Sequence, residues 1–385
     1  MEIVVALRFI NNDFYHPNFL STCRKTETRF STMSHVLSWL CLLGMLQFTV
    51  SIDESDCPFL CACVLDSVNG GVNITCDEPS FLPSSFPSNS RHIQFRNAIF
   101  NAIPAVNGFS DLKQLSTIAF INSTITTIRA CSFAQLRHVD SITFKMCNIQ
   151  TIQGNSFSNL VNVTSINLLD SIIGQILSYA FHNIKHMKIL LMQGSVIQVI
   201  HPLAFQDFSH VNSIEIRESI IKRFLVNGFS KFDDVRKLVI GEKTKIMELQ
   251  CEVFETVLDA GGSLDIQNTH FTCDCKLAWM WSKLDSFQMF FPDSSNQCID
   301  TSDMLSSIDI NQLCPDERSR KKGCPPLLPS TPHICSQGFD EIDEPISKVA
   351  YPTLYPTTPS GFEHQGLNMG LMVLLLMLTL TYMYC

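Results

Sequence analysis

One apolar pattern recurs at a fixed interval through the middle of this 385-residue chain. Five phenylalanines are spaced 24 residues apart, at Phe133, Phe157, Phe181, Phe205 and Phe229. A second apolar series keeps the same interval, at Ile118, Ile142, Ile166, Leu190, Ile214 and Leu238. A single unit of this length cannot bury its own apolar face. The sustained period therefore predicts a solenoid, in which stacked coils share one continuous core.

Each repeat contains a short segment that reads as a strand. Two residues after each member of the second series stands another apolar residue: Phe120, Phe144, Leu168, Met192, Ile216 and Ile240. Side chains alternate along a strand, so this spacing places both apolar residues inward and their immediate neighbours outward. Less regular coils at Ile93–Phe95 and Leu264–Ile266 flank the run. We therefore expect about eight parallel strands, with the repeats proper over residues 90–262.

The period and the strand pattern resemble those of leucine-rich repeats. The resemblance implies an α/β solenoid, a horseshoe whose concave side is a parallel sheet. That family places an asparagine after each strand, where it bonds to the backbone of neighbouring coils. Here the position is held by Ser123, Cys147, Ser171, Ser195 and Ser219. A serine hydroxyl both donates and accepts hydrogen bonds, so we expect a shorter ladder of hydroxyl groups in its place.

A cysteine cluster precedes the repeats, within residues 52–89. Its members are Cys57, Cys61, Cys63 and Cys76. The cluster resembles the N-terminal cap of extracellular leucine-rich-repeat proteins, which implies the bridges Cys57–Cys63 and Cys61–Cys76. Such a cap covers the apolar core that the end of a solenoid exposes. A zinc site is the competing interpretation, and an oxidising compartment disfavours it.

A second cysteine cluster follows the repeats, within residues 263–315. It contains Cys273, Cys275, Cys298 and Cys314, with Trp279 between the two pairs. The cluster resembles the C-terminal cap of the same family. The resemblance implies the bridges Cys273–Cys298 and Cys275–Cys314, with a tryptophan packed over the last coil.

Between the predicted leader and the apolar tail, five further cysteines lie outside the caps. Cys324 and Cys335 flank a proline-rich loop, and we expect them to pair. Cys147 stands at an inward position and reads as a buried free thiol. Cys131 and Cys251 share one register five coils apart, too far to bridge each other, and are expected to be buried and unpaired.

The first 51 residues are predicted to be a leader. Val36–Val50 forms an apolar core of the kind found in signal peptides, and small residues follow it near Ser51. A leader that starts at Met33 has ordinary proportions, so the mature chain is expected to begin near Ile52. The alternative is an uncleaved signal anchor, for which 15 apolar residues are short.

The composition changes after the second cap. Residues 316–365 are rich in proline, threonine and charge, which predicts a disordered stalk. Residues 366–385 are apolar, and no basic cluster follows them. With the polar spacer before it, this tail matches the signal for a glycosylphosphatidylinositol anchor better than a simple transmembrane helix. Three N-x-[ST] sequons add candidate glycan sites, at Asn73, Asn122 and Asn162.

The sequence lacks the motifs that catalysis would need. It contains no zinc-protease helix motif, no phosphate-cradling glycine loop and no nucleophile elbow. The histidines show no metal-ligand spacing. A net charge of −9 disfavours nucleic acid as a partner. We therefore expect a protein that is not an enzyme and that has no cofactor or metal site.

Function is expected on the outward positions of the concave sheet. Leu169, Ile189 and Leu191 would form an apolar patch there beside charged residues, although scattered surface aliphatics are also normal. The predicted ligand-binding residues are Ile121, Lys145, Asn167, Leu169, Ile189, Leu191, Gln193, Glu215, Arg217 and Lys237.

Repeats, caps and tail together resemble the architecture of Nogo-receptor-like proteins and of variable lymphocyte receptors. The resemblance implies a cell-surface protein, on the extracellular face of the plasma membrane, that binds a protein ligand or co-receptor. Adhesion, co-receptor function and immune recognition all fit. A secreted matrix protein, or a non-catalytic subunit of a secreted complex, is the alternative. The sequence leaves the ligand and the oligomeric state open.

Overall fold

A computed structural model describes residues 57–66, 68, 70–105, 108–254, 257, 259–282, 295–315 and 335. The predicted leader, the apolar tail and all of the stalk except Cys335 lie outside these residues. Within the described part of the chain, no helix is long and apolar enough to cross a membrane.

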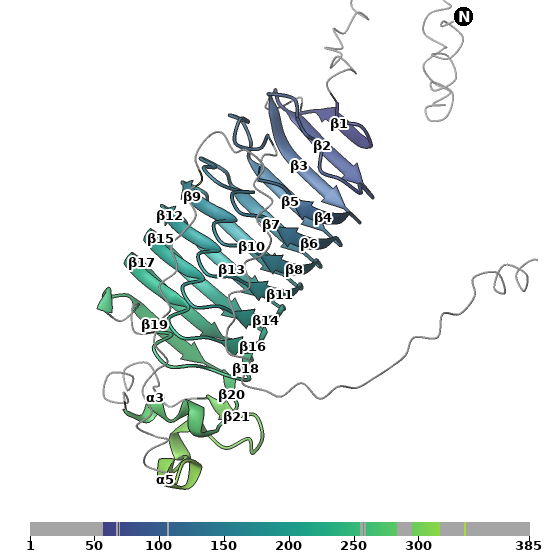
Figure 1. Cartoon of the computed structure of the whole chain (residues 1–385). Helices are drawn as coiled ribbons and strands as arrows, with labels where there is room; N and C mark the ends of the chain where they lie inside the picture. The colour runs from purple at the N-terminus through teal and green to yellow at the C-terminus, as the bar shows by residue number, and fades with distance from the viewer. Residues whose placement is uncertain are drawn as a thin grey trace, which may run out of the picture. The chain divides into compact units, whose positions relative to one another are not determined.

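Eight parallel strands form one wall of the coil stack, which we call sheet A (Figure 1). They are β3 (Ser90–Arg96), β5 (Thr117–Ile121), β7 (Ser141–Lys145), β10 (Ser165–Leu169), β13 (Ile189–Gln193), β15 (Phe205–Arg217), β17 (Phe229–Gly241) and β19 (Ser263–Gln267). From β5 to β17, each residue pairs with the one 24 positions later, as Ile166 does with Leu190. The predicted parallel strands and their register are confirmed.

The N-terminal cap extends sheet A by two more strands. β2 (Val72–Asp77) pairs in parallel with β3, and β1 (Cys61–Leu65) pairs antiparallel with β2. The bridges Cys57–Cys63 and Cys61–Cys76 join these strands and the chain before them. The antiparallel strand ends the parallel stack, so the cap closes the core at this end.

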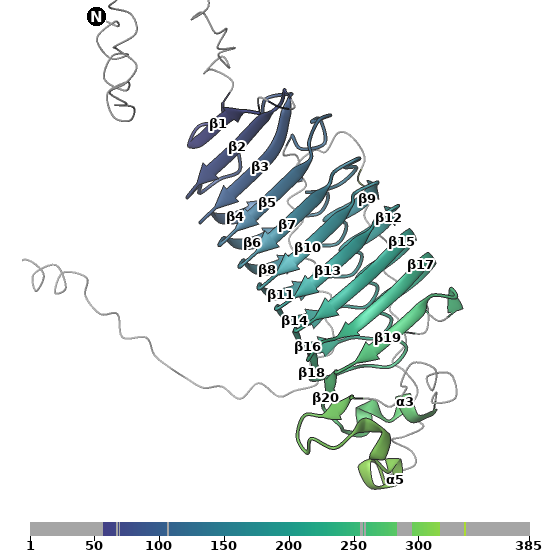
Figure 2. The ribbon, with the colours of Figure 1, turned by 180° about the vertical axis from the view of Figure 1, so that it is seen from behind.

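The remaining walls of the stack are also built from strands. Sheet B contains β4 (Ile99–Ile103), β6 (Thr124–Ile128), β8 (Asn148–Ile152), β11 (Ile172–Ile176), β14 (Val196–Ile200), β16 (Ile220–Phe224), β18 (Lys245–Ile246), β20 (His270–Phe271) and β21 (Gln297–Cys298). A third wall comprises β9 (Phe157–Val161), β12 (Phe181–Lys185) and the first halves of β15 and β17, which lie side by side in Figures 1 and 2.

Helix is scarce in this solenoid. The helical elements with described bounds are the single turns α3 (Trp279–Ser282) and α5 (Ile310–Leu313), with the 3₁₀ turns η2 (Cys275–Leu277) and η3 (Leu305–Ser307); Val257 and Asp259 are also helical. All four turns belong to the C-terminal cap, so the expected solenoid with its parallel sheet is confirmed, and it carries little helix on the side away from sheet A. Residues with left-handed backbone interrupt each coil there, Asn159 and Asn183 among them, and such residues break a helix.

The core is a column of stacked aromatic rings. The periodic phenylalanines are fully buried, and their ring centroids repeat at 4.9 Å from Phe133 to Phe157 and at 4.8 Å from Phe157 to Phe181. Phe144 meets Phe157 edge to face at 6.1 Å. Offset-stacked and edge-to-face pairs are the favoured arrangements of aromatic rings. One ring per coil therefore fills the same space at every level of the stack.

Hydroxyl groups link the coils where the family pattern has asparagine. The Ser171 Oγ accepts a hydrogen bond from the Cys147 N–H at 3.0 Å and donates one to the Leu169 carbonyl at 2.7 Å. Ser195 and Ser219 repeat this arrangement one and two coils further on. The expected short ladder is confirmed.

Cys147 occupies one level of the hydroxyl ladder. Its Sγ lies 3.3 Å from the Phe120 carbonyl, to which the thiol donates. It is buried and is the free cysteine among the described residues, as predicted. Burial raises the pKa of this thiol to about 11, so it is protonated and unreactive at neutral pH.

The cysteines outside the caps pair differently from the prediction. Cys335 is bonded to Cys131, so the expected Cys324–Cys335 bridge is wrong. Gln135 Nε2 donates to the Cys335 carbonyl at 3.0 Å, and the Ser158 hydroxyl donates to its Sγ at 3.3 Å. Residue 335 thus lies against the coil of Cys131, a contact across 204 residues that no periodic pattern encodes.

The prediction that Cys251 is unpaired is also wrong, because this cysteine is disulfide-bonded. The two cap bridges at the other end, Cys273–Cys298 and Cys275–Cys314, are present as the resemblance implied. All the described cysteines except Cys147 are therefore oxidised.

A left-handed turn ends each sheet A strand. The residues at this turn have φ between +49° and +64°: Asn97, Asn122, Met146, Asp170, Gly194, Glu218, Glu242 and Asn268. Asparagine tolerates this backbone, and the Asn122 Nδ2 donates to the Asn97 Oδ1 at 2.8 Å. Methionine has no such compensation, and the Met146 side chain is exposed.

We expect Met146→Asn to stabilise the protein by about 1 kcal/mol, because asparagine adopts a left-handed backbone more easily than methionine does. Urea unfolding followed by circular dichroism would measure the change. The reciprocal variant Asn97→Met is the control and should destabilise. Equal midpoints for Met146→Asn and wild type would show that this turn stores no strain.

Peptide mapping without reduction should recover Cys131 joined to Cys335. Iodoacetamide at pH 8 should leave Cys147 unmodified in the folded protein and modify it after denaturation, because a buried thiol with a raised pKa is neither accessible nor ionised. A Cys324–Cys335 peptide would contradict this pairing. Alkylation of Cys147 in the native state would contradict its burial.

Candidate recognition surface

The outward side chains of sheet A form three columns that run across the strands. One column passes through Asn167, Leu191 and Glu215, and the others lie two residues to either side. All ten predicted ligand-binding residues occupy these columns on β5, β7, β10, β13, β15 and β17. Their neighbours Leu190 and Met192 are fully buried, so the predicted faces of the strands are assigned correctly.

Three aliphatic residues, one in each column, lie on the adjacent strands β10 and β13, and we call them the apolar patch: Leu169, Ile189 and Leu191. Each is half-buried between its column neighbours. Ile121 shares the column of Leu169 but is separated from it by Lys145. The patch therefore runs diagonally across the two strands, because Leu169 is in register with Gln193 and Ile189 with Ser165. Ile121 lies outside it.

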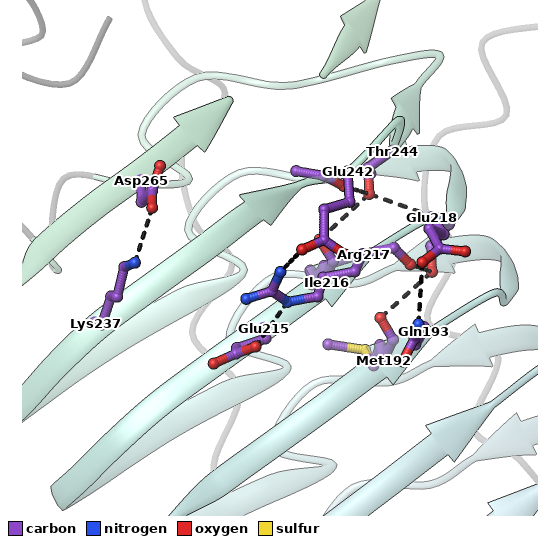
Figure 3. Close-up of polar contacts among 12 residues, drawn as sticks. Met192, Gln193, Glu215, Ile216, Arg217, Glu218, Lys237, Glu242, Thr244 and Asp265 are labelled. Atoms are coloured by element: carbon purple, nitrogen blue, oxygen red, sulfur yellow. Dashed lines mark hydrogen bonds and ion pairs between the residues drawn. The ribbon is translucent and has the colours of Figure 1, made fainter. Parts of the chain in front are cut away.

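Charged residues occupy β15, β17 and β19 next to the patch, and we call them the charged network (Figure 3). Arg217 Nε lies 2.7 Å from Glu215 Oε2, and the same guanidinium pairs with Glu242. Lys237 Nζ lies 2.8 Å from Asp265 Oδ2. A guanidinium held between two carboxylates presents a fixed fork of donors, which favours one orientation of a bound ligand.

The charged network continues towards the apolar patch. Gln193 Nε2 donates to Glu218 Oε1 at 3.1 Å. The sequence prediction included Gln193, Glu215, Arg217 and Lys237 but missed their acidic partners. Glu218 and Glu242 stand at the end turn of the next strand, 25 residues away, and Asp265 stands on the next strand two residues beyond the register partner of Lys237, 28 residues away. A search for opposite charges one coil apart would have found them.

The three sequons differ in exposure. Asn122 and Asn162 are exposed and lie at left-handed turns. Asn73 is half-buried on β2, and its side-chain oxygen is buried without a hydrogen-bond partner. Asn122 directly follows β5, at the edge of sheet A, so a glycan there would lie beside the recognition surface.

No group of three or more histidine, cysteine or acidic side chains suited to a metal ion occurs among the described residues. The charged side chains of the network on sheet A are instead paired with one another.

Stacked coils with one parallel strand each on sheet A, closed at both ends by disulfide caps, define a leucine-rich-repeat solenoid. Residues 103–236 match the model of the BspA-type leucine-rich repeat region in six copies. A search of curated proteins found none that matches the chain.

Two solved structures are similar to this chain at low sequence identity. Human 5T4, also called Wnt-activated inhibitory factor 1 or trophoblast glycoprotein, is 12% identical, with 68% of this chain and 99% of that one covered and a TM-score of 0.34. A chain in the octameric complex of Latrophilin 3, Unc5D and FLRT2 is 13% identical, with 67% and 99% covered and a TM-score of 0.24.

Proposed function

We propose that this protein is a cell-surface recognition protein that binds a protein ligand through the outward face of sheet A. The apolar patch is the observation that carries the proposal. Leu169, Ile189 and Leu191 lie on adjacent strands of a surface whose other outward positions are mostly polar. Clustered aliphatics with a polar border are typical of a binding site between proteins.

The charged network supplies the other half of such a site. Burial of the patch would provide affinity at about 25 cal/mol per Å² of apolar surface removed from water. The fixed carboxylates around Arg217 would orient the ligand and exclude partners that carry acidic groups at that point. The surface therefore suits a ligand with an apolar centre flanked by basic or hydrogen-bond-donating groups.

Disulfides support an extracellular location, because bridges such as Cys131–Cys335 persist in oxidising compartments. We further propose that the apolar segment 366–385, with small residues at Thr358, Ser360 and Gly361 before it, directs attachment of a lipid anchor. A secreted structural protein is the second candidate, and it is compatible with the same disulfides.

Phosphatidylinositol-specific phospholipase C should release the protein from the surface of cells that express the full chain, because the enzyme cleaves the anchor and leaves the protein intact. Immunoblotting of the medium before and after treatment gives the result. Protein that stays on treated cells would contradict the lipid anchor. Protein found in the medium without treatment would favour the secreted candidate.

The double variant Leu169→Glu, Leu191→Lys should weaken ligand binding at least 30-fold, a loss of about 2 kcal/mol, because both new charges would be desolvated at the centre of the interface. The introduced glutamate would stand beside Lys145 and the introduced lysine beside Glu215 in their columns, so folding should be retained. The measurement is a titration against a binder identified by screening the full chain on an array of recombinant ectodomains.

Ile172→Lys is the matched control, since it introduces the same kind of change at an exposed aliphatic residue of sheet B. It should leave binding unchanged. If the double variant folds and binds as wild type does, sheet A is not the recognition surface. If only the control loses binding, the ligand contacts sheet B.

A further inference from the structure

A second column of exposed side chains lies between the third wall and the start of the sheet A strands. It follows the ends of β9 and β12 and comprises residues 24 positions apart: His138, Asn162, His186, His210 and Asp234. Each has a left-handed backbone, with φ from 54° to 58°. Each side chain is exposed. The solenoid period has therefore placed two histidines directly next to each other in adjacent coils.

The spacing between these two histidines is set by the backbone. Lys185 pairs with Ser209 in the register of β12 and β15, one residue before each histidine. The His186 N–H donates to the Ser209 carbonyl at 3.0 Å. The two imidazole ring centroids lie 4.8 Å apart, with their planes tilted by 33°.

This separation suits two imidazoles that share one metal ion. A Zn²⁺ ion lies about 2.0–2.1 Å from an imidazole nitrogen, hence about 3.2 Å from the ring centroid. Two rings at a ligand–metal–ligand angle of roughly 90–110° then have centroids about 4.5–5.2 Å apart, by the same bond lengths. The observed 4.8 Å falls inside this interval. The exposed rings need only side-chain rotation to converge.

We propose that His186 and His210 form a two-ligand binding site for a divalent transition-metal ion such as Zn²⁺. Imidazole nitrogen suits zinc, copper and nickel ions, and water completes the coordination in the free protein. Asp233 and Asp234 follow on the next coil, and Asp233 pairs with Ser209 in the strand register. Their charges favour a cation there, whereas the exposed Lys185 opposes it.

Other histidines on this wall lack the same arrangement. His138 precedes Asn162 in the column, so no second imidazole stands on the coil after it. His182 Nε2 is hydrogen-bonded to Asp207 Oδ2 at 3.0 Å, so this imidazole is paired with a carboxylate and not with a second imidazole. The metal site is therefore specific to one pair of coils.

Asparagine is the appropriate replacement in a test, because it tolerates the left-handed backbone and already occupies this column at Asn162. We expect His186→Asn and His210→Asn each to weaken Zn²⁺ binding at least tenfold. His138→Asn, at the equivalent turn, should bind as wild type does. Isothermal titration of ZnCl₂ into the purified full chain at pH 7.5 gives the affinities.

A double variant, His186→Asn with His210→Asn, defines the background from other groups on the chain. The proposal expects one micromolar event above that background. Wild type that shows no binding above the double variant would overturn it. So would single variants that both retain wild-type affinity, or a loss confined to His138→Asn. Unchanged circular dichroism would confirm that every variant is folded.

Discussion

Backbone hydrogen bonds between successive coils are the constraint on which the rest of this structure depends. In the central coils they pair each residue with the one 24 positions later. The neighbour of each side chain is therefore the residue at the same position of the next coil. Apolar counterparts build the phenylalanine column, and hydroxyl counterparts build the ladder from Ser171 to Ser219. The same rule places Leu169 next to Gln193 and His186 next to His210. The same register therefore determines which side chains are neighbours in the core and on the surface.

That rule explains how far the sequence alone could predict the fold. Period and alternation were sufficient to distinguish Leu190, which is fully buried, from Leu191, which is half-exposed beside it. They were also sufficient for the eight strands of sheet A. They did not specify the strands of the other walls, such as β9 and β12, which contain the left-handed residues Asn159 and Asn183. Cys131–Cys335 was beyond reach for another reason, since the contact joins a periodic coil to a segment outside the repeat.

The acidic partners of the predicted charged residues show a second limit of prediction from the sequence. Arg217 was predicted on the recognition surface, but Glu242 stands 25 residues later, at the turn after the next strand. Lys237 is in register with Ser263, 26 residues later because the final coil is longer, and its ion pair is with Asp265, two residues further along the same strand. Both ion pairs therefore join residues that are not in register, so the repeat period alone does not identify them. The histidine pair was missed for the opposite reason: its spacing equals the period, whereas metal ligands are usually sought a few residues apart.

The in-register pairing of equivalent residues also separates the positions that determine stability from those available for recognition. A change at Leu190 acts on the shared core of three coils, because its neighbours at Ile166 and Ile214 pack on either side. A change at Leu191 meets Asn167 and Glu215, whose side chains face solvent in part. Alternate positions of one five-residue strand are therefore under different constraints. The outward columns can vary in charge and polarity while the inward ones maintain the stack, which is the property that a recognition surface requires.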